Sequence, residues 1–297
     1  MSALVDFPQD LPWEKHPAFL LLDGVTVPDL KSKLSAWHPA APRIALYAGT
    51  RFDAISEISP WLVVLEGASD PVFQAFLADA SQEWGALLFS EKPLHAVVRH
   101  LRELLTVHVP DGPEVMLRLA DPAVTHALFA MPDRDERLFG PIDTLVLADC
   151  VENRWHRHQR LASDGSVLPK KYRLSLEQNT ALDSADLRRA TLKLDAHLLE
   201  YFPDLRTSNS LPQRWPALQQ QVRDAYAQGF SSQSDLTYYI NIFAWLGDSP
   251  IAQHPEIARL LDRTCTGTSS ARVAAAAELA RTWANNQPAT QERLDEQ

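Results

Sequence analysis

The sequence contains fewer positively charged than negatively charged residues. Its 297 residues include 28 lysines and arginines against 38 aspartates and glutamates, which gives a formal net charge of −10. Proteins that bind nucleic acid or anionic membranes rely on basic patches that attract phosphate groups and release counterions. The deficit therefore argues against nucleic acid and against an anionic membrane surface as partners.

Cysteine is also rare. Only Cys150 and Cys265 occur, they lie far apart, and neither belongs to a CxxC pair. This usage is typical of a reducing compartment and offers no disulfide or zinc framework. The first residues, MSALVDFPQDLPWEK, carry acids and prolines where a secretory signal would need a basic start and an apolar stretch. Since the longest apolar runs fall far short of the roughly 20 residues that span a bilayer, we expect a cytoplasmic protein.

Catalytic signatures are missing from the chain. It contains no GxSxG, GxxxxGK[ST], GxGxxG or HExxH pattern, and its ten glycines give little material for a phosphate-binding loop. A catalytic triad can still assemble from distant positions. An α/β hydrolase with a scattered triad therefore remains an alternative, with Cys150 or Ser90, each just after a predicted strand, as the nucleophile.

The N-terminal part of the chain alternates short apolar runs with amphipathic segments. Residues 93–105 place their leucines and valines on one helical stripe. Asp70 followed by Pro71 marks the start of a helix that runs to Trp84 and is stopped by Gly85. This alternation predicts an α/β lobe whose mixed or largely parallel sheet is covered by helices. The predicted strands begin at Ala18, Arg43, Trp61, Gly85, Glu114 and Asp143.

Strand patterns disappear in the C-terminal part of the chain. Residues 163–182 are polar and rich in turn formers, and five helical patterns follow, the first capped by Asp183. We therefore predict an α/β domain over 1–162, a linker over 163–182 and an all-helical lobe over 183–297.

Few side chains stand out as candidates for a site. His156 and His158 would share one face of a strand, but no third metal ligand is indicated nearby, so we interpret this segment as a polar edge strand. Arg118 ends a predicted strand and Asp121 caps the next helix, which allows the two to pair across that corner. Trp155 lies in a polar setting, where it could either face a partner or pack under a loop.

Several segments of the N-terminal lobe occur together in an order that is similar to one protein family. The chain resembles the adaptor-chaperone family of bacterial type VI secretion, long catalogued as a domain of unknown function. It departs from the family pattern RFYDP, because Leu119 and Ala120 precede the Asp-Pro here. The segments are LLDG from Leu21, ALYAGT from Ala45, SPWLVVLE from Ser59, WGALLFSE from Trp84, HLRELLTVHVPDGPEVMLRLADPAVTHAL from His100 and FGPIDTL from Phe139.

The resemblance implies a non-catalytic cytoplasmic carrier. Such a protein binds a toxic effector and promotes its loading onto the VgrG spike without being exported, and it needs no cofactor or metal. We expect the effector or spike segment to bind in a groove between the lobes. An immunity protein that inhibits a toxin is the other alternative. The candidate partner-binding residues are Arg99, Arg102, Arg118, Asp121 and Trp155.

Overall fold

The computed structural model of the chain describes residues 4, 7–161, 168–169, 171–203 and 210–286. The chain divides into two compact units, residues 1–186 and 187–297. No helix among the described residues is long and apolar enough to cross a membrane. Each unit has its own hydrophobic core and is considered by itself below.

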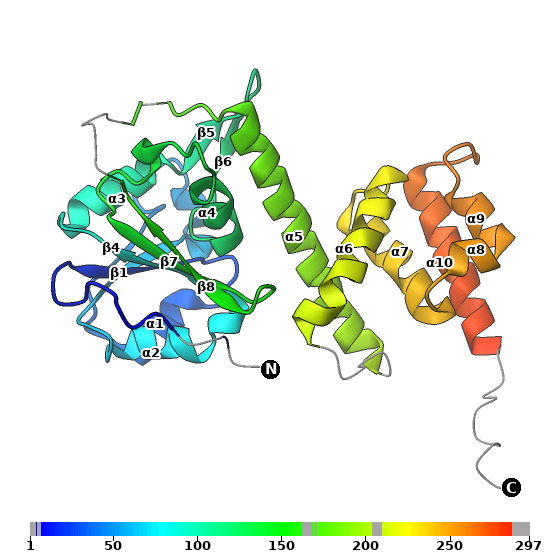
Figure 1. Cartoon of the computed structure of the whole chain (residues 1–297), viewed down its shortest axis with the longest axis horizontal. Coiled ribbons are helices and arrows are strands. Elements are labelled where there is room, and N and C mark those ends of the chain that lie inside the picture. Colours follow the sequence, from blue (N-terminus) through cyan, green and yellow to red (C-terminus); the bar gives the residue numbers. More distant parts are fainter. Residues whose placement is uncertain (1–3, 5–6, 162–167, 170, 204–209, 287–297) are drawn as a thin grey trace, which may run out of the picture. The chain divides into compact units, whose positions relative to one another are not determined.

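A six-stranded sheet forms the centre of the first unit (Figure 1). The prediction of a mixed or largely parallel sheet was wrong, because every pairing between neighbouring strands in this sheet is antiparallel. The strands follow the order β2-β3-β1-β4-β7-β8. Their bounds are β1 (Ala18–Leu22), β2 (Arg43–Ala45), β3 (Trp61–Leu65), β4 (Gly85–Phe89), β7 (Thr144–Asp149) and β8 (Arg154–Gln159).

The central strands are apolar along their whole length because both faces of the sheet are covered. In β1, Phe19 and Leu21 enter one core, whereas Leu20 and Leu22 enter the core on the opposite face. Such continuous apolar runs are typical of parallel sheets, which is why the sequence favoured one. The apolar runs indicate that both faces of the sheet are buried, but they do not indicate the direction of the strands. The predicted polar edge strand is confirmed, since β8 lies at the end of the sheet.

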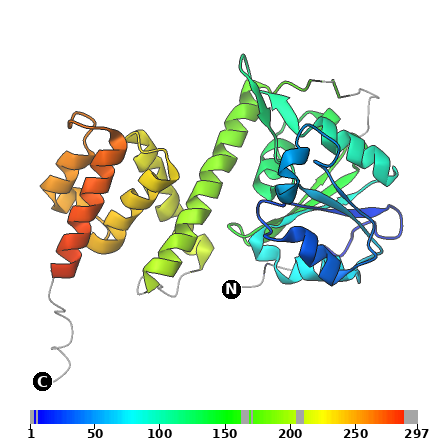
Figure 2. The ribbon, with the colours of Figure 1, turned by 180° about the vertical axis from the view of Figure 1, so that it is seen from behind.

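Helices form a layer on each face of this sheet. Figure 1 shows α3 (Leu94–Glu103) and α4 (Pro122–Phe129) on one side, and α1 (Leu30–Trp37) and α2 (Pro71–Ala78) on the other. Seen from behind, α1 and α2 again share one side of the sheet (Figure 2). A separate hairpin of β5 (Thr106–His108) and β6 (Glu114–Met116) adds to the core under α3 and α4, and β5 had not been predicted.

Helix starts in this unit follow the expected chemistry. The side chain of Asp70 accepts the N–H of Val72 at 2.8 Å, and Pro71 occupies the first turn of α2. The predicted helix over 70–84 is shorter than expected, since α2 ends at Ala78 and a 3-10 helix follows over Ala80–Gln82. Short polar side chains at the cap and proline at the first turn are the strongest local start signals in a sequence.

The described residues of the second unit form helices and no strand, which confirms the predicted helical lobe. Its core contains Leu218 of α6, Tyr239 and Ile240 of α7 and Val273 of α10, and α10 packs against α7 and α9. Ser232 caps α7 by accepting the N–H of Asp235. The helices are α6 (Leu211–Ala227), α7 (Gln233–Leu246), α8 (Pro250–Gln253), α9 (Pro255–Leu261) and α10 (Ser269–Asn286).

The segment predicted as a linker has structure of its own. Helix α5 (Leu176–Tyr201) begins at Leu176 instead of Asp183, and the unit boundary falls inside this helix. Ahead of it, Tyr172 and Leu174 are buried in the core of the first unit. Residues 162–167 and 170 lie outside the described residues, so the predicted range 163–182 is described only in part.

Candidate functional site

An internal ion pair joins Asp23 to Arg118. Asp23 directly follows β1, and its side chain is 2% exposed. One of its carboxylate oxygens accepts a hydrogen bond from Nη2 of Arg118. The same carboxylate accepts the N–H of Val25 and the hydroxyl of Thr26, each at 3.0 Å. Arg118 is therefore paired with a residue 95 positions away in the sequence, and its predicted pairing with Asp121 stays a prediction. Asp23 thus holds the turn that follows β1 and also neutralises a half-buried arginine.

Asp121 acts as the cap of α4. Its side chain accepts the N–H of Ala123 at 2.9 Å, and its backbone N–H donates to the carbonyl of Arg118. The hydroxyl of Thr125 donates a hydrogen bond to the carbonyl of Leu119 at 2.7 Å. These bonds fix the corner between β6 and α4 from inside, since Asp121 is buried. A role for Asp121 in partner binding stays a prediction.

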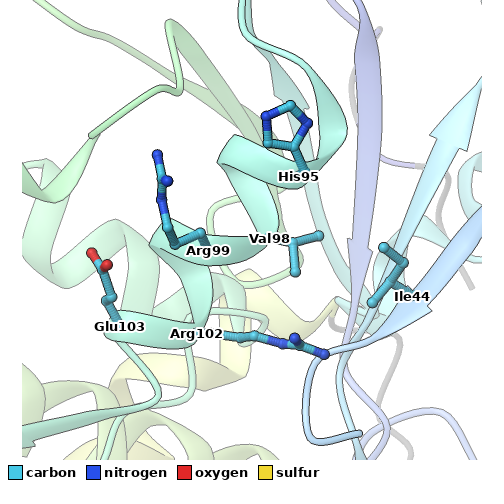
Figure 3. A pocket seen from close by; sticks show the side chains of 6 residues that line it. All are labelled: Ile44, His95, Val98, Arg99, Arg102 and Glu103. Atoms are coloured by element: carbon cyan, nitrogen blue, oxygen red, sulfur yellow. The ribbon is translucent and has the colours of Figure 1, made fainter. Parts of the chain in front are cut away.

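A shallow hollow lies on the surface over α3. Its volume is about 490 Å³. Figure 3 shows Val98 and Arg102 directed toward Ile44 of β2, whereas Arg99 and Glu103 point away from it. The apolar floor and charged rim suit a protein segment that presents one apolar side chain beside an acidic group. The lining residues are Ile44, His95, Val98, Arg99, Arg102 and Glu103.

Arg99 and Arg102 differ in how they are held. Arg102 donates from Nε to the carbonyl of Leu46 at 3.0 Å and from Nη2 to that of Ala48 at 2.8 Å, so its guanidinium ties α3 to the loop after β2. Arg99 is exposed, and no partner for its guanidinium is found among the described residues. Of these two candidate arginines, Arg99 is the one available to an incoming carboxylate.

The loop after β2 connects the hollow with the Asp23–Arg118 pair. Tyr47 follows the residue that binds Arg102, and its hydroxyl donates to the sulfur of Met116 at 3.3 Å. Burial raises the pKa of Tyr47, and the negative charge of Asp23 adds to that rise. The structure thus brings Arg99, Arg102 and Arg118 to one side of the first unit.

Trp155 lies on the opposite side of the sheet from these arginines. It packs edge-on against Phe7, with ring centroids 5.0 Å apart, and against Phe76 of α2. These contacts belong to the core under α1 and α2. The structure therefore shows Trp155 packed under the N-terminal segment, and its contact with a partner stays a prediction.

Three histidines gather between β8 and α4. His126 Nδ1 lies 3.1 Å from His158 Nε2, and the rings of His126 and His156 are 3.8 Å apart between centroids. Burial lowers the pKa of His126 to about 4, with a further decrease from neighbouring His156. Burial and the charge of His126 likewise lower the pKa of His158 to about 4. Both imidazoles are therefore neutral near pH 7.

The hydroxyl of Ser90 is unsuited to the nucleophilic role considered from sequence. Ser90 is fully buried, its Oγ donates to the carbonyl of Pro141 at 2.5 Å, and the same oxygen accepts the N–H of Lys92. A nucleophile needs access to substrate and a neighbouring base. This serine instead anchors the end of β4.

Comparison with protein families identifies the N-terminal domain. The model described as "Domain of unknown function (DUF4123)" matches residues 18–138. The chain carries a DUF4123 domain. This match confirms the family resemblance seen in the sequence. The matched segment contains Asp23, Arg99, Arg102, Arg118 and Asp121, and it ends before β7 and β8.

One similar curated protein extends the comparison beyond the DUF4123 domain. The chain is 28% identical over 269 residues to "Accessory protein VasW" of Vibrio cholerae serotype O1, which covers 88% of this chain and 87% of VasW. No solved structure matches the chain. The similarity to an accessory protein therefore spans the DUF4123 domain and the helical unit together.

Sequence reasoning missed the groups that surround the two strand histidines. His126 comes from α4, and Asp149 comes from the end of β7, with its Oδ2 3.3 Å from His156 Nε2. The pairing register of β7 with β8, which sets Leu147 opposite His156, brings Asp149 and His156 together. A hairpin signal around Asn153, which adopts a positive φ of 54°, could have placed Asp149 near His156.

Proposed function

We propose that this protein is a type VI secretion adaptor that binds a toxic effector and promotes its loading onto the VgrG spike. The similarity to accessory protein VasW over 88% of the chain carries the proposal, together with the DUF4123 domain. In this role the protein acts in the cytoplasm, is not exported and catalyses no reaction. Its partners are the cognate effector and VgrG.

The hollow over α3 supports a place for the contact within the DUF4123 domain. It offers an apolar floor at Ile44 and Val98 beside the exposed guanidinium of Arg99. An arginine at the rim of an apolar surface is a common anchor of protein interfaces. We propose that a segment of the effector or of the spike presents a carboxylate to Arg99 and an apolar side chain to the floor.

Co-expression tests the adaptor role. The chain is produced with the products of its adjacent spike and effector genes, and complexes are isolated by affinity pull-down and size-exclusion chromatography with mass determination. Co-elution in a defined ratio is the expected result. Absence of association with both partners would refute the proposal, and a complex in which the toxin's own activity is abolished would identify an immunity protein instead.

A charge reversal tests the position of the contact. Arg99→Glu should weaken capture of the partner at least tenfold while leaving the thermal midpoint unchanged, because Arg99 is exposed. Lys31→Glu on α1 is the matched control, since it makes the same charge change on the opposite side of the sheet. Equal capture by both variants would exclude the hollow.

A further inference from the structure

A group of metal-binding side chains lies at the hairpin between β7 and β8, apart from the hollow over α3. Asp149 ends β7, Glu152 belongs to the turn, and His156 lies in β8. One ligand atom from each residue lies within 4.8 Å of the other two. The antiparallel register places Leu147 opposite His156 and Asp149 opposite Arg154, so Asp149 and His156 are diagonal neighbours on one face.

The distances within this group match a coordination shell. His156 Nε2 lies 3.3 Å from Asp149 Oδ2 and 3.5 Å from Glu152 Oε2. Zinc binds histidine nitrogen and carboxylate oxygen at about 2.0–2.2 Å, which separates the ligands of a tetrahedral ion by roughly 3.3–3.5 Å. Two of the three distances between the ligand atoms already have this length, and a single ion can reach all three atoms.

Two of these ligands are positioned before any ion arrives. The second carboxylate oxygen of Asp149 accepts the N–H groups of Val151 and Glu152, each at 2.9 Å, which orients Oδ2 toward His156. The imidazole of His156 is 9% exposed and is flanked by the ring of His126. Hydrogen bonds that fix the orientation of a ligand in this way raise metal affinity.

Arg154 is a weak competitor for Glu152. Arg154 contacts Oε2 of Glu152, but its side chain is 59% exposed and that of Glu152 is 46% exposed. Ion pairs this open to solvent contribute little. A divalent ion that gains a buried imidazole and a buried carboxylate as well would displace the guanidinium.

We propose that Asp149, Glu152 and His156 form a binding site for a divalent transition-metal ion, with Zn²⁺ as the ion that fits best and a solvent molecule as the fourth ligand. Mixed imidazole and carboxylate ligands favour zinc over Mg²⁺ and Ca²⁺, which prefer shells of oxygen alone. The ion would link the end of β7 to the edge strand β8 and thereby stabilise the hairpin.

The test uses the full chain without a histidine tag, stripped with chelator and titrated with ZnCl₂ by calorimetry at pH 7.5. We expect one strong site per chain and a rise in the thermal midpoint on zinc addition, with no rise on CaCl₂ addition. Cobalt substitution should give the visible absorption bands of a tetrahedral ion with nitrogen and oxygen ligands.

Variants show whether the ion occupies this hairpin. Glu152→Gln and His156→Gln should each weaken zinc binding at least tenfold. Glu278→Gln is the matched control, because Glu278 is also exposed and arginine-paired, and it should bind zinc as the unaltered chain does. Since Glu152 is exposed, its variant keeps the test valid even if His156→Gln fails to fold. Absence of zinc binding, or binding unaffected by Glu152→Gln, would overturn the proposal.

Discussion

Replacing Asp23 with alanine should destabilise the first unit strongly. The substitution leaves the guanidinium of Arg118, whose side chain is only 24% exposed, without its carboxylate, and it removes the acceptor for the N–H of Val25. Breaking a buried pair on one side costs about 3–5 kcal/mol. Because water reaches part of Arg118, we expect a loss near the lower limit, about 3 kcal/mol in the free energy of unfolding.

Urea unfolding followed by tryptophan fluorescence measures this loss. Arg118→Met serves as the companion variant, because it removes the charge and keeps much of the apolar stem. In the double variant Asp23→Ala with Arg118→Met, neither charge is left alone, so the combined loss should be at least 1 kcal/mol smaller than the sum of the two single losses. Strict additivity, or a loss below about 0.5 kcal/mol for Asp23→Ala, would refute the reasoning about this ion pair.

Three further predictions concern the same unit. Gly140→Ala should cost about 3 kcal/mol, because Gly140 has a φ of +52° and an added Cβ would lie 2.3 Å from the ring of His100; a thermal melt equal to that of the unaltered protein would contradict this. Asp121→Ala should cost about 1 kcal/mol through the lost cap of α4, whereas Asp121→Ser should restore most of it, as measured in urea. Burial lowers the pKa of His100 in the folded protein, so the unfolded state binds more protons below its own pKa near 6.5. The contribution of His100 to stability should therefore be constant above about pH 6.5 and fall as the pH decreases toward the folded pKa, and His100→Gln should reduce the difference in urea midpoint between pH 7.5 and pH 5.

Local patterns in this chain predicted the positions of its elements well. The apolar runs at Ala18, Trp61 and Gly85 each became a buried strand, and Asp70 with Pro71 marked the start of α2. Strand direction was not predictable in this way, because a run such as Phe19 to Leu22 is equally apolar in either orientation. Strand direction depends on the path that the connecting helices and loops give the chain. A short segment of sequence does not contain that information.

The site residues show the same division between local and long-range information. The cap at Asp121 follows from nearby sequence and is confirmed. The partner of Arg118 could not be found locally, since Asp23 lies 95 residues away. Likewise, His156 meets Asp149 only through the strand register. Contacts of this kind need the topology of the sheet first.

The Asp23–Arg118 pair also gives a physical reason why two of the resembling segments occur together. LLDG supplies Asp23, and the segment before Asp-Pro supplies Arg118. A protein that forms this ion pair therefore needs both segments. Gly24 fits the same requirement, because a Cβ there would lie 2.3 Å from the carbonyl oxygen of Ser59. These segments therefore indicate a shared fold more directly than a shared partner.

The three candidate arginines call for separate experiments because they are held in different ways. Alanine at Arg102 removes donors to the carbonyls of Leu46 and Ala48, and alanine at Arg118 leaves Asp23 buried without its cation. A variant that combines all three would lose stability as well as any partner contact, so a loss of binding would not locate the contact. Arg99 is exposed, so its replacement changes the surface and leaves the contacts of Arg102 and Arg118 intact. Loss of capture by Arg99→Glu, at an unchanged melting temperature, is therefore the observation that would place the partner on the hollow over α3.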